Sequence, residues 1–364
     1  FLADSLIRFL GSEGWEKKVT SLRERMGALT PQGVSISLAE VIENPQFEDL
    51  VERMALVWGY QERGMPFTAL EECYQLVERA PDYLPLHLLL GGIFLQQEKI
   101  REAVEKYASV AKTYLARGVP RRAISLYKAA AELDPVDTEV RQRLIDLLIG
   151  ERKVEEALEG YMTLAESDYR LARVPEALEA YEAALRLASQ SSSPERWGSR
   201  ILRRKADLNM QRADWKGALS QYREIKRLEP DDEKVRQALV ELCLRLGQPE
   251  KGYEELEELM GWYRRQGESG LAFLQRMVEE RPEDMELRQR LAENYFLLGM
   301  KEEAVRELDA LGEQQLAGGL REEAKGTIRL IISLEPDDVE AYRQFLERLV
   351  FKLHKLIQEI TLTG

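Results

Sequence analysis

Apolar residues recur along this chain with the period of an α-helix and show no strand-like alternation. Leu144, Leu147 and Leu148 fall on one helical face, and Leu291 and Tyr295 fall on another. Strong helix formers, chiefly Ala, Leu, Glu, Arg and Gln, fill the positions between these faces. The pattern therefore predicts an all-α protein.

Turn-forming residues divide the helical pattern into segments. Glycine at a helix end supplies a left-handed closing residue, and proline fits the first turn of the next helix. The closing glycines that we expect are Gly64, Gly150, Gly247 and Gly299. Helices are expected near residues 48–62, 66–79, 83–97, 100–117, 120–133, 137–150, 153–171, 173–188, 195–211, 214–227, 232–246, 250–265, 268–280, 284–298, 301–317, 320–334 and 338–360.

Proline recurs at a regular interval, which indicates internal duplication. Pro81 and Pro135 are 54 residues apart, Pro230 and Pro282 are 52 apart, and Pro282 and Pro336 are 54 apart. An Arg-Gln pair follows three of these prolines after six residues, at Arg141-Gln142, Arg236-Gln237 and Arg288-Gln289. A fourth pair, Arg343-Gln344, is offset by one residue.

Each repeated span also pairs a small residue with a large residue one helical turn later. A small residue lets two antiparallel helices approach closely, and the large residue fills the groove beside it. The pairs are Ala103 with Tyr107, Ala157 with Tyr161, Gly252 with Leu256, and Ala304 with Leu308.

These landmarks resemble the tetratricopeptide repeat (TPR) family over roughly residues 48–350, with Leu90-Gly91, Phe94, Ala103 and Tyr107 forming one copy of its 34-residue pattern. The Trp usual at the fourth position is replaced by His87, Arg141, Arg236 and Arg288. The small landmarks step alternately by 34 and 20 residues, so the unit has 34 + 20 = 54 residues and three helices. The resemblance implies a right-handed superhelical α-solenoid of stacked antiparallel helices.

The repeats divide the chain into segments. We expect an atypical helical cap over 1–47, TPR-like helices over 48–188 and 195–337, and a capping helix over 338–364. The Ser-rich run 189–194 is expected to be a loop. It forms either a hinge between two solenoid halves or an insertion that leaves the stacking continuous.

An apolar stripe on the last expected helix leaves two interpretations open. The stripe caps the final helix pair, or it contacts a partner or a second subunit and makes a homo-oligomer through the terminal helices. It consists of Phe345, Leu349, Leu353, Leu356 and Ile360.

Composition narrows the class of protein. The 364 residues include 52 Lys and Arg against 65 Asp and Glu, a net charge of −13, which disfavours binding to nucleic acid or anionic membranes over the whole surface. Two Cys and two His exclude a disulfide framework and a Cys/His zinc site. No apolar run is long enough to span a membrane. The start at Phe1 predicts a fragment of a longer chain, and the low Cys count favours the cytoplasm.

Catalytic signatures such as G-x-S-x-G, H-E-x-x-H and C-x-x-C are missing from the sequence. We therefore expect no catalytic residues, no cofactor and no metal site. His87 is interpreted as a core histidine, and Cys73 and Cys243 as small buried hydrophobes.

A basic segment stands out within the acidic chain. It is either a patch for an anion, a nucleic acid or an acidic partner, or a solvated face neutralised by acids on adjacent helices. Its core is Arg196, Trp197, Arg200, Arg203 and Arg204.

The resemblance also implies where a partner would bind, because the first helix of each pair lines a concave groove in TPR proteins. The groove-type positions are Glu139, Gln142 and Asp146, then Lys234, Gln237 and Glu241, then Glu286, Gln289, Glu293 and Phe296. A three-helix unit would exchange the inner and outer helix layers from one unit to the next. The paired Lys and Asn of the family's clamp for chaperone C-termini are missing, so that function is not implied.

The expected function is therefore a non-enzymatic scaffold or adaptor that binds a partner protein or peptide in the solenoid groove. An alternative is a regulatory or oligomerising segment of a larger enzyme or of a transcriptional or signalling regulator. A further alternative is anion or nucleic-acid contact through the basic middle repeat.

Overall fold

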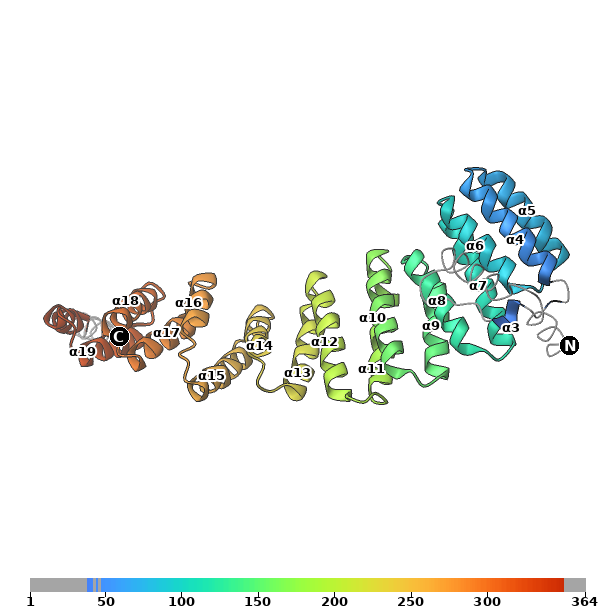
Figure 1. Ribbon diagram of the computed structural model, residues 1–364. Helices are drawn as coiled ribbons and strands as arrows, with labels where there is room; N and C mark the ends of the chain where they lie inside the picture. The colour runs from blue at the N-terminus through green and yellow to red at the C-terminus, as the bar shows by residue number, and fades with distance from the viewer. Residues whose placement is uncertain (1–37, 42–43, 45–46, 350–364) are drawn as a thin grey trace, which may run out of the picture. The chain divides into compact units, whose positions relative to one another are not determined.

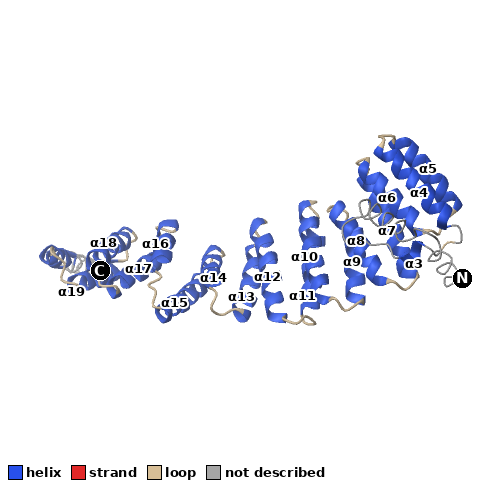
Figure 2. Cartoon of the chain, viewed as in Figure 1, coloured by secondary structure: helices blue, strands red, loops and turns tan. Residues whose placement is uncertain are grey.

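The computed structural model describes residues 38–41, 44 and 47–349, and these residues form helices and short connections with no strand (Figures 1 and 2). The segments near the two ends, including most of the last apolar stripe, lie outside the described residues. The helices are α3 (Leu38–Val41), α4 (Phe47–Glu62), α5 (Pro66–Arg79), α6 (Leu84–Gln96), α7 (Ile100–Ala116), α8 (Pro120–Leu133), α9 (Thr138–Gly150), α10 (Val154–Arg170), α11 (Val174–Ala188), α12 (Pro194–Gln211), α13 (Trp215–Leu228), α14 (Glu233–Arg245), α15 (Pro249–Gln266), α16 (Leu271–Glu280), α17 (Met285–Leu297), α18 (Lys301–Ala317) and α19 (Arg321–Ser333).

The all-α prediction is confirmed, and the helix boundaries expected between residues 48 and 334 agree with the structure to within about three residues. The last expected helix is present over 339–349, as far as the described residues extend. Its side chain Phe345 is 45% exposed.

Helix lengths reproduce the three-helix unit. The first helices, α6, α9, α14 and α17, each have 13 residues. The middle helices, α7, α10, α15 and α18, have 17 or 18. The start of α9 lies 138 − 84 = 54 residues after the start of α6, and that of α17 lies 285 − 233 = 52 after that of α14.

One unit lacks its first helix. Helices α12 and α13 begin 249 − 194 = 55 and 271 − 215 = 56 residues before α15 and α16, which makes them a middle helix and a third helix. The connection over 189–193 leads from α11 directly into α12, with no first helix between them. This missing helix explains why the proline spacing breaks once along the chain.

The two turns inside a unit share one backbone device. In most of these turns a residue in the left-handed conformation lies two positions past the end of the preceding helix, as at Arg152 (φ 58°) after α9 and Ala172 (φ 60°) after α10. In the turn after α15 it lies one position past the end, at Gly267 (φ 77°). The next backbone N–H then closes the turn, and that of Lys153 donates to the Leu148 carbonyl at 2.8 Å. Gly150 was expected to close α9, and this was wrong. It is the last helical residue, and the position that needs a positive φ is Arg152.

The turn between units is built differently, from proline and aspartate. The Asp two residues after the proline accepts a hydrogen bond from the third backbone N–H of the new helix, which satisfies one unpaired donor there. The distances are 3.0 Å for Asp137 and Val140, 2.9 Å for Asp232 and Val235, and 3.1 Å for Asp284 and Leu287.

The recurring arginine belongs to this same turn. Six residues after the proline, its guanidinium donates back to the prolyl carbonyl and joins the turn to the first helix. The distances are 3.3 Å from Arg141 to Pro135, 2.8 Å from Arg236 to Pro230, and 3.3 Å from Arg288 to Pro282. In the earlier unit His87 takes this place, with Nε2 donating to the Pro81 carbonyl at 2.6 Å. The repeated Arg is therefore structural.

Small residues on the middle helices make the close approach that the sequence predicts. The side chains of Ala103, Ala157 and Ala304 are completely buried. A methyl group built on Gly252 would lie 2.6 Å from Cδ2 of Leu244, so α14 and α15 touch at this position.

The chain divides into two compact units, Phe1–Leu208 and Asn209–Gly364, with the boundary inside α12. The first unit has a core that runs from Val41 to Leu208, and it includes α6, whose residues are buried on nearly every side. The second has a core that runs from Val240 to Leu334. Cys73 and Cys243 lie buried as free thiols, as predicted, and burial raises the pKa of Cys73 to about 12.

Candidate functional site

A pocket of about 570 Å³ lies in the first compact unit among three consecutive helices, α9, α10 and α11. We call it the α9–α11 pocket. Its lining consists of Thr138, Glu139 and Gln142 from α9, Tyr161, Leu164 and Asp168 from α10, and Arg173, Glu176, Glu179, Ala180, Ala183 and Arg186 at or within α11.

The local sequence explains why there is space here. The lining positions of α11 follow helical spacing, and two of them, Ala180 and Ala183, have the smallest side chain that a helix former offers. Tyr161 and Leu164 of α10 supply apolar wall opposite them. The lining therefore combines four apolar side chains with eight polar or charged ones.

Asp168 is the unusual member of the lining. Its side chain is only 7% exposed, and the nearest cation, Nη1 of Arg173, lies 3.8 Å from Oδ1, beyond hydrogen-bonding distance. Burial raises the pKa of this carboxyl, the charge of Glu176 adds to the effect, and the Arg173 guanidinium opposes it. A buried carboxylate with so little compensation costs folding free energy.

Arg173 makes its side-chain hydrogen bond to Thr138 rather than to Asp168. Its Nη1 donates to Oγ1 of Thr138 at 3.2 Å, which ties the start of α11 to the start of α9. Its side chain is half exposed. This contact joins the two walls of the pocket.

Two of the three groove positions predicted on α9 line this pocket. Glu139 forms an ion pair with Arg143, and Nε2 of Gln142 donates to the carboxylate of Asp146 at 2.8 Å. Asp146, the third predicted position, is exposed outside the lining.

The predicted positions on α14 have internal partners. Gln237 donates to Glu233 at 2.9 Å and to the hydroxyl of Tyr263 at 2.7 Å, and that hydroxyl donates to Glu233 at 2.6 Å. Glu241 pairs with Arg276 of α16 at 2.7 Å. Lys234 is exposed.

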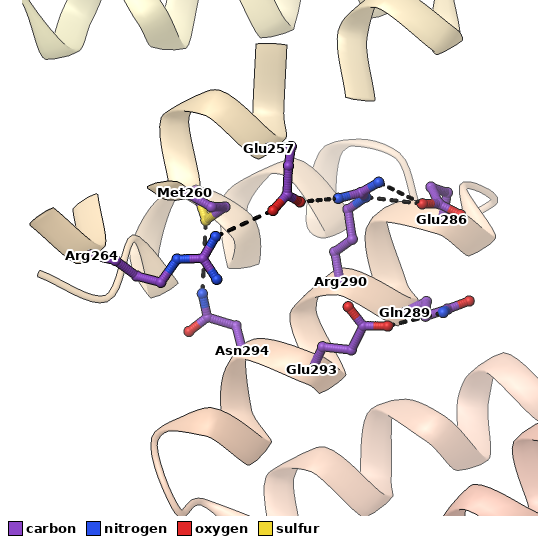
Figure 3. A network of polar contacts seen from close by, with 8 residues as sticks. All are labelled: Glu257, Met260, Arg264, Glu286, Gln289, Arg290, Glu293 and Asn294. Carbon is purple, nitrogen blue, oxygen red and sulfur yellow. Dashed lines mark hydrogen bonds and ion pairs between the residues drawn. The ribbon is translucent and has the colours of Figure 1, made fainter. Parts of the chain in front are cut away.

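The predicted positions on α17 lie around a chain of charges shown in Figure 3. Arg290 bridges Glu286, at 2.9 Å, and Glu257 of α15, at 2.6 Å, and Glu257 also accepts from Arg264 at 3.2 Å. Beyond this network Gln289 donates to Glu293 at 3.0 Å. Phe296, at the end of the helix, is 55% exposed.

The structure places the α14 and α17 positions in different helix layers of the second unit. The ion pair between Glu241 and Arg276 places α14 beside α16. The ion pair between Arg290 and Glu257, and the contact of 3.7 Å between Asn294 and Met260, place α17 beside α15 (Figure 3). An odd number of helices per unit exchanges the layers, as the sequence indicated. A single continuous groove through both sets is therefore not present within this unit.

The basic segment on α12 is partly neutralised by its neighbours. Arg200 forms a bidentate ion pair with Glu159 of α10, in which the longer N–O distance is 2.9 Å. Its guanidinium also stacks on Trp197, with 4.9 Å between the guanidinium carbon and the ring centroid. Lys205 pairs with Glu182 of α11 at 3.1 Å. Arg196 and Arg204 are exposed, and Arg203 is half-buried. These contacts support the interpretation as a neutralised face.

Most of the pocket residues were not predictable from the sequence. Asp168 left a signal, because it continues the apolar stripe of α10 formed by Ala157, Tyr161, Leu164 and Ala165, where another apolar residue would be expected. An acid inside an apolar stripe is a residue that burial penalises.

Within the described residues no helix has the length and apolarity to cross a membrane, and no three or more potential metal ligands lie close together.

No protein-family model matches this chain. No match was found among curated protein sequences. The solved structures that resemble it include the apo form of the quorum sensor NprR from B. thuringiensis, which is 16% identical over 92% of this chain and 97% of that chain, with a TM-score of 0.34. The TPR2AB domain of yeast Sti1 is 13% identical over 78% of this chain and 98% of that chain, with a TM-score of 0.27. The MamA protein is 13% identical over 45% and 93%, with a TM-score of 0.27.

These similarities concern the helical-repeat architecture. The coordinates themselves show helices of repeating length joined by repeating turns. The chain therefore has the fold of a TPR-like α-solenoid.

Proposed function

We propose that this chain is a non-enzymatic scaffold that binds an extended segment of a partner protein in the α9–α11 pocket. The observation that carries the proposal is the pocket itself. Its volume of about 570 Å³ lies within the range of roughly 300–1,000 Å³ typical of ligand sites. Four of its twelve lining residues are apolar and eight are polar or charged, so the pocket is more polar than most ligand sites and suits a polar side chain.

The framework around the pocket suits a binding role. Helix α10 packs on both α9 and α11, and the Arg173–Thr138 hydrogen bond joins α11 to α9. A rigid site loses less conformational entropy when a segment binds than a mobile site does. The cavity accepts one or two side chains of a partner, while neighbouring helix surfaces are available for weaker contacts around it.

The test is selection of pocket-dependent peptides. A phage-displayed library of random dodecapeptides is panned on the purified chain and then rescreened on two variants. Ala183→Trp fills the pocket with an indole ring, and the matched control Ala272→Trp places the same ring on an exposed position of α16. Circular dichroism confirms that both variants keep the helical content.

We expect enriched peptides to bind the parent chain and the Ala272→Trp variant, and to lose binding to the Ala183→Trp variant. If no enriched peptide depends on Ala183, the α9–α11 pocket is not the binding site and the proposal is wrong.

A further inference from the structure

We propose that the α9–α11 pocket selects a cationic side chain, lysine or arginine, from the bound segment, with the Asp168 carboxylate as its counter-ion. This inference rests on the function proposed above and specifies the chemistry of the partner. It begins with Asp168, which is buried to 7% side-chain exposure and lines the pocket.

Among the described residues, the Asp168 carboxylate has only a long ion pair, at 3.8 Å, with Arg173. An ionised carboxylate offers about four lone-pair sites to donors. Arg173 approaches only to 3.8 Å and makes its hydrogen bond to Thr138 instead. An ammonium or guanidinium group entering the pocket would supply the short charge-assisted hydrogen bonds that the folded chain does not.

The other charges of the lining favour the same sign of ligand. Four acids line the pocket against two arginines, Arg173 and Arg186, a balance of 2 − 4 = −2. Glu139 is paired with Arg143, which leaves Glu176 and Glu179 on α11 beside Asp168. An acidic segment would have to approach three carboxylates, so like-charge repulsion opposes it.

The apolar part of the pocket fits the stem of the same side chains. Lysine and arginine carry three or four methylene groups that pack on apolar surface while the charged head reaches a polar partner. Tyr161, Leu164, Ala180 and Ala183 offer such a surface. The pocket thus offers apolar surface together with a buried carboxylate, and a neutral apolar side chain would leave that carboxylate without a hydrogen-bond donor.

The unfavourable burial of the Asp168 charge also favours a cationic ligand. Burial and Glu176 raise the pKa of its carboxyl, so the ionised form destabilises the unliganded fold. A bound cation would compensate this charge and recover the free energy as affinity. Removing the carboxylate should therefore weaken the binding of a cationic side chain.

The experiment uses four fluorescein-labelled dodecapeptides, (Ala-Ala-Lys)4, (Ala-Ala-Arg)4, (Ala-Ala-Gln)4 and (Ala-Ala-Glu)4, titrated with the full chain and followed by fluorescence anisotropy. Asp168→Asn removes the charge without changing the shape, and Asp168→Ser is a second neutral variant. The matched control is Glu166→Gln, because Glu166 lies on the exposed side of α10 and pairs with Arg170 at 2.8 Å, outside the pocket.

We expect the Lys and Arg peptides to bind at least about tenfold more tightly than the Gln peptide, equivalent to about 1.4 kcal/mol. Both Asp168 variants should reduce this preference to threefold or less, and Glu166→Gln should keep it. Binding of the basic peptides should also be lost in Ala183→Trp, which separates the pocket from general attraction to an acidic chain.

Two results would overturn the inference while leaving the proposed function standing. One is Ala183-dependent binding of the Gln or Glu peptide, or of selected peptides without basic residues, as tight as that of the Lys peptide. The other is Ala183-dependent binding of basic peptides that persists in both Asp168 variants. Failure of the proposed function has a different signature, because the library then yields no Ala183-dependent peptide at all.

Discussion

Replacing Arg236 with methionine tests whether the recurring arginine holds the turn between repeat units. Its Nε donates to the carbonyl of Pro230 at 2.8 Å, and its side chain is only 10% exposed. Methionine keeps most of the aliphatic packing and removes this hydrogen bond, together with a long ion pair of 4.0 Å between Nη1 and the exposed Glu258. We therefore expect a local loss of stability at the start of α14.

The size of the loss follows from the surroundings of the bond. A hydrogen bond to a charged group contributes about 1.5–3 kcal/mol. Pro230 is exposed, so water replaces the lost donor at its carbonyl, and the cost should lie near the lower end, about 1.5 kcal/mol. Since 1.4 kcal/mol is a factor of ten, backbone amides of residues 229–240 should exchange about tenfold faster.

Hydrogen–deuterium exchange followed by mass spectrometry measures this change in the segment itself, which suits a repeat protein whose regions open separately. The matched control is Arg227→Met. Arg227 is 75% exposed and pairs with Glu224 at 2.8 Å within one helix, so its loss should cost less than about 0.5 kcal/mol. Exchange in Arg236→Met within twofold of the control would refute a structural role for the arginine.

Two further predictions concern packing and charge. Gly252→Ala should destabilise the second unit by about 1–3 kcal/mol, because the new methyl group meets Leu244. Gly326→Ala should stabilise α19 by about 0.5–1 kcal/mol, because its methyl group has no atom within 4 Å and alanine favours the helix. Urea denaturation of both variants tests whether the two changes in unfolding free energy have opposite signs. Asp168→Asn should be more stable than the parent chain at pH 7. Burial and Glu176 raise the folded pKa of this carboxyl above its ordinary 3.8, with Arg173 opposing, so the parent loses stability as pH rises through that folded pKa. The difference should disappear below about pH 3.8, and thermal melts that show a less stable variant at pH 7 would contradict the assignment.

The sequence predicts the helices and turns of the repeat unit, but not the role of each side chain. Helix positions were predictable because apolar periodicity and turn residues act locally, within one or two turns of helix. The same patterns recorded the turn between units, since Pro230, Asp232 and Arg236 recur at fixed spacing. Their roles were not predictable, because the Arg-Gln pair reads equally as a ligand contact or as a structural one. The coordinates separate the two, with Arg236 bonded to the turn and Gln237 bonded to Glu233 and Tyr263.

The candidate site divides in the same way. Glu139 and Gln142 were predicted as contact positions, and both line the pocket. Asp168 and Arg173 were missed, because a pocket depends on which side chains of different helices meet. That meeting depends on the turns that set the helices in place, and on the small size of Ala180 and Ala183.

The sequence by itself determined an all-helical repeat with a three-helix period, a break in that period at the Ser-rich run 189–194, and an acidic chain with a basic segment. These properties follow from local periodicity, spacing and charge, which need no knowledge of distant contacts. Only the tertiary structure decided that α14 and α17 present their polar faces in different layers, that Arg200 and Lys205 are neutralised, and that Asp168 lies buried in a pocket. The physical reason is that burial and pairing depend on side chains brought together across helices.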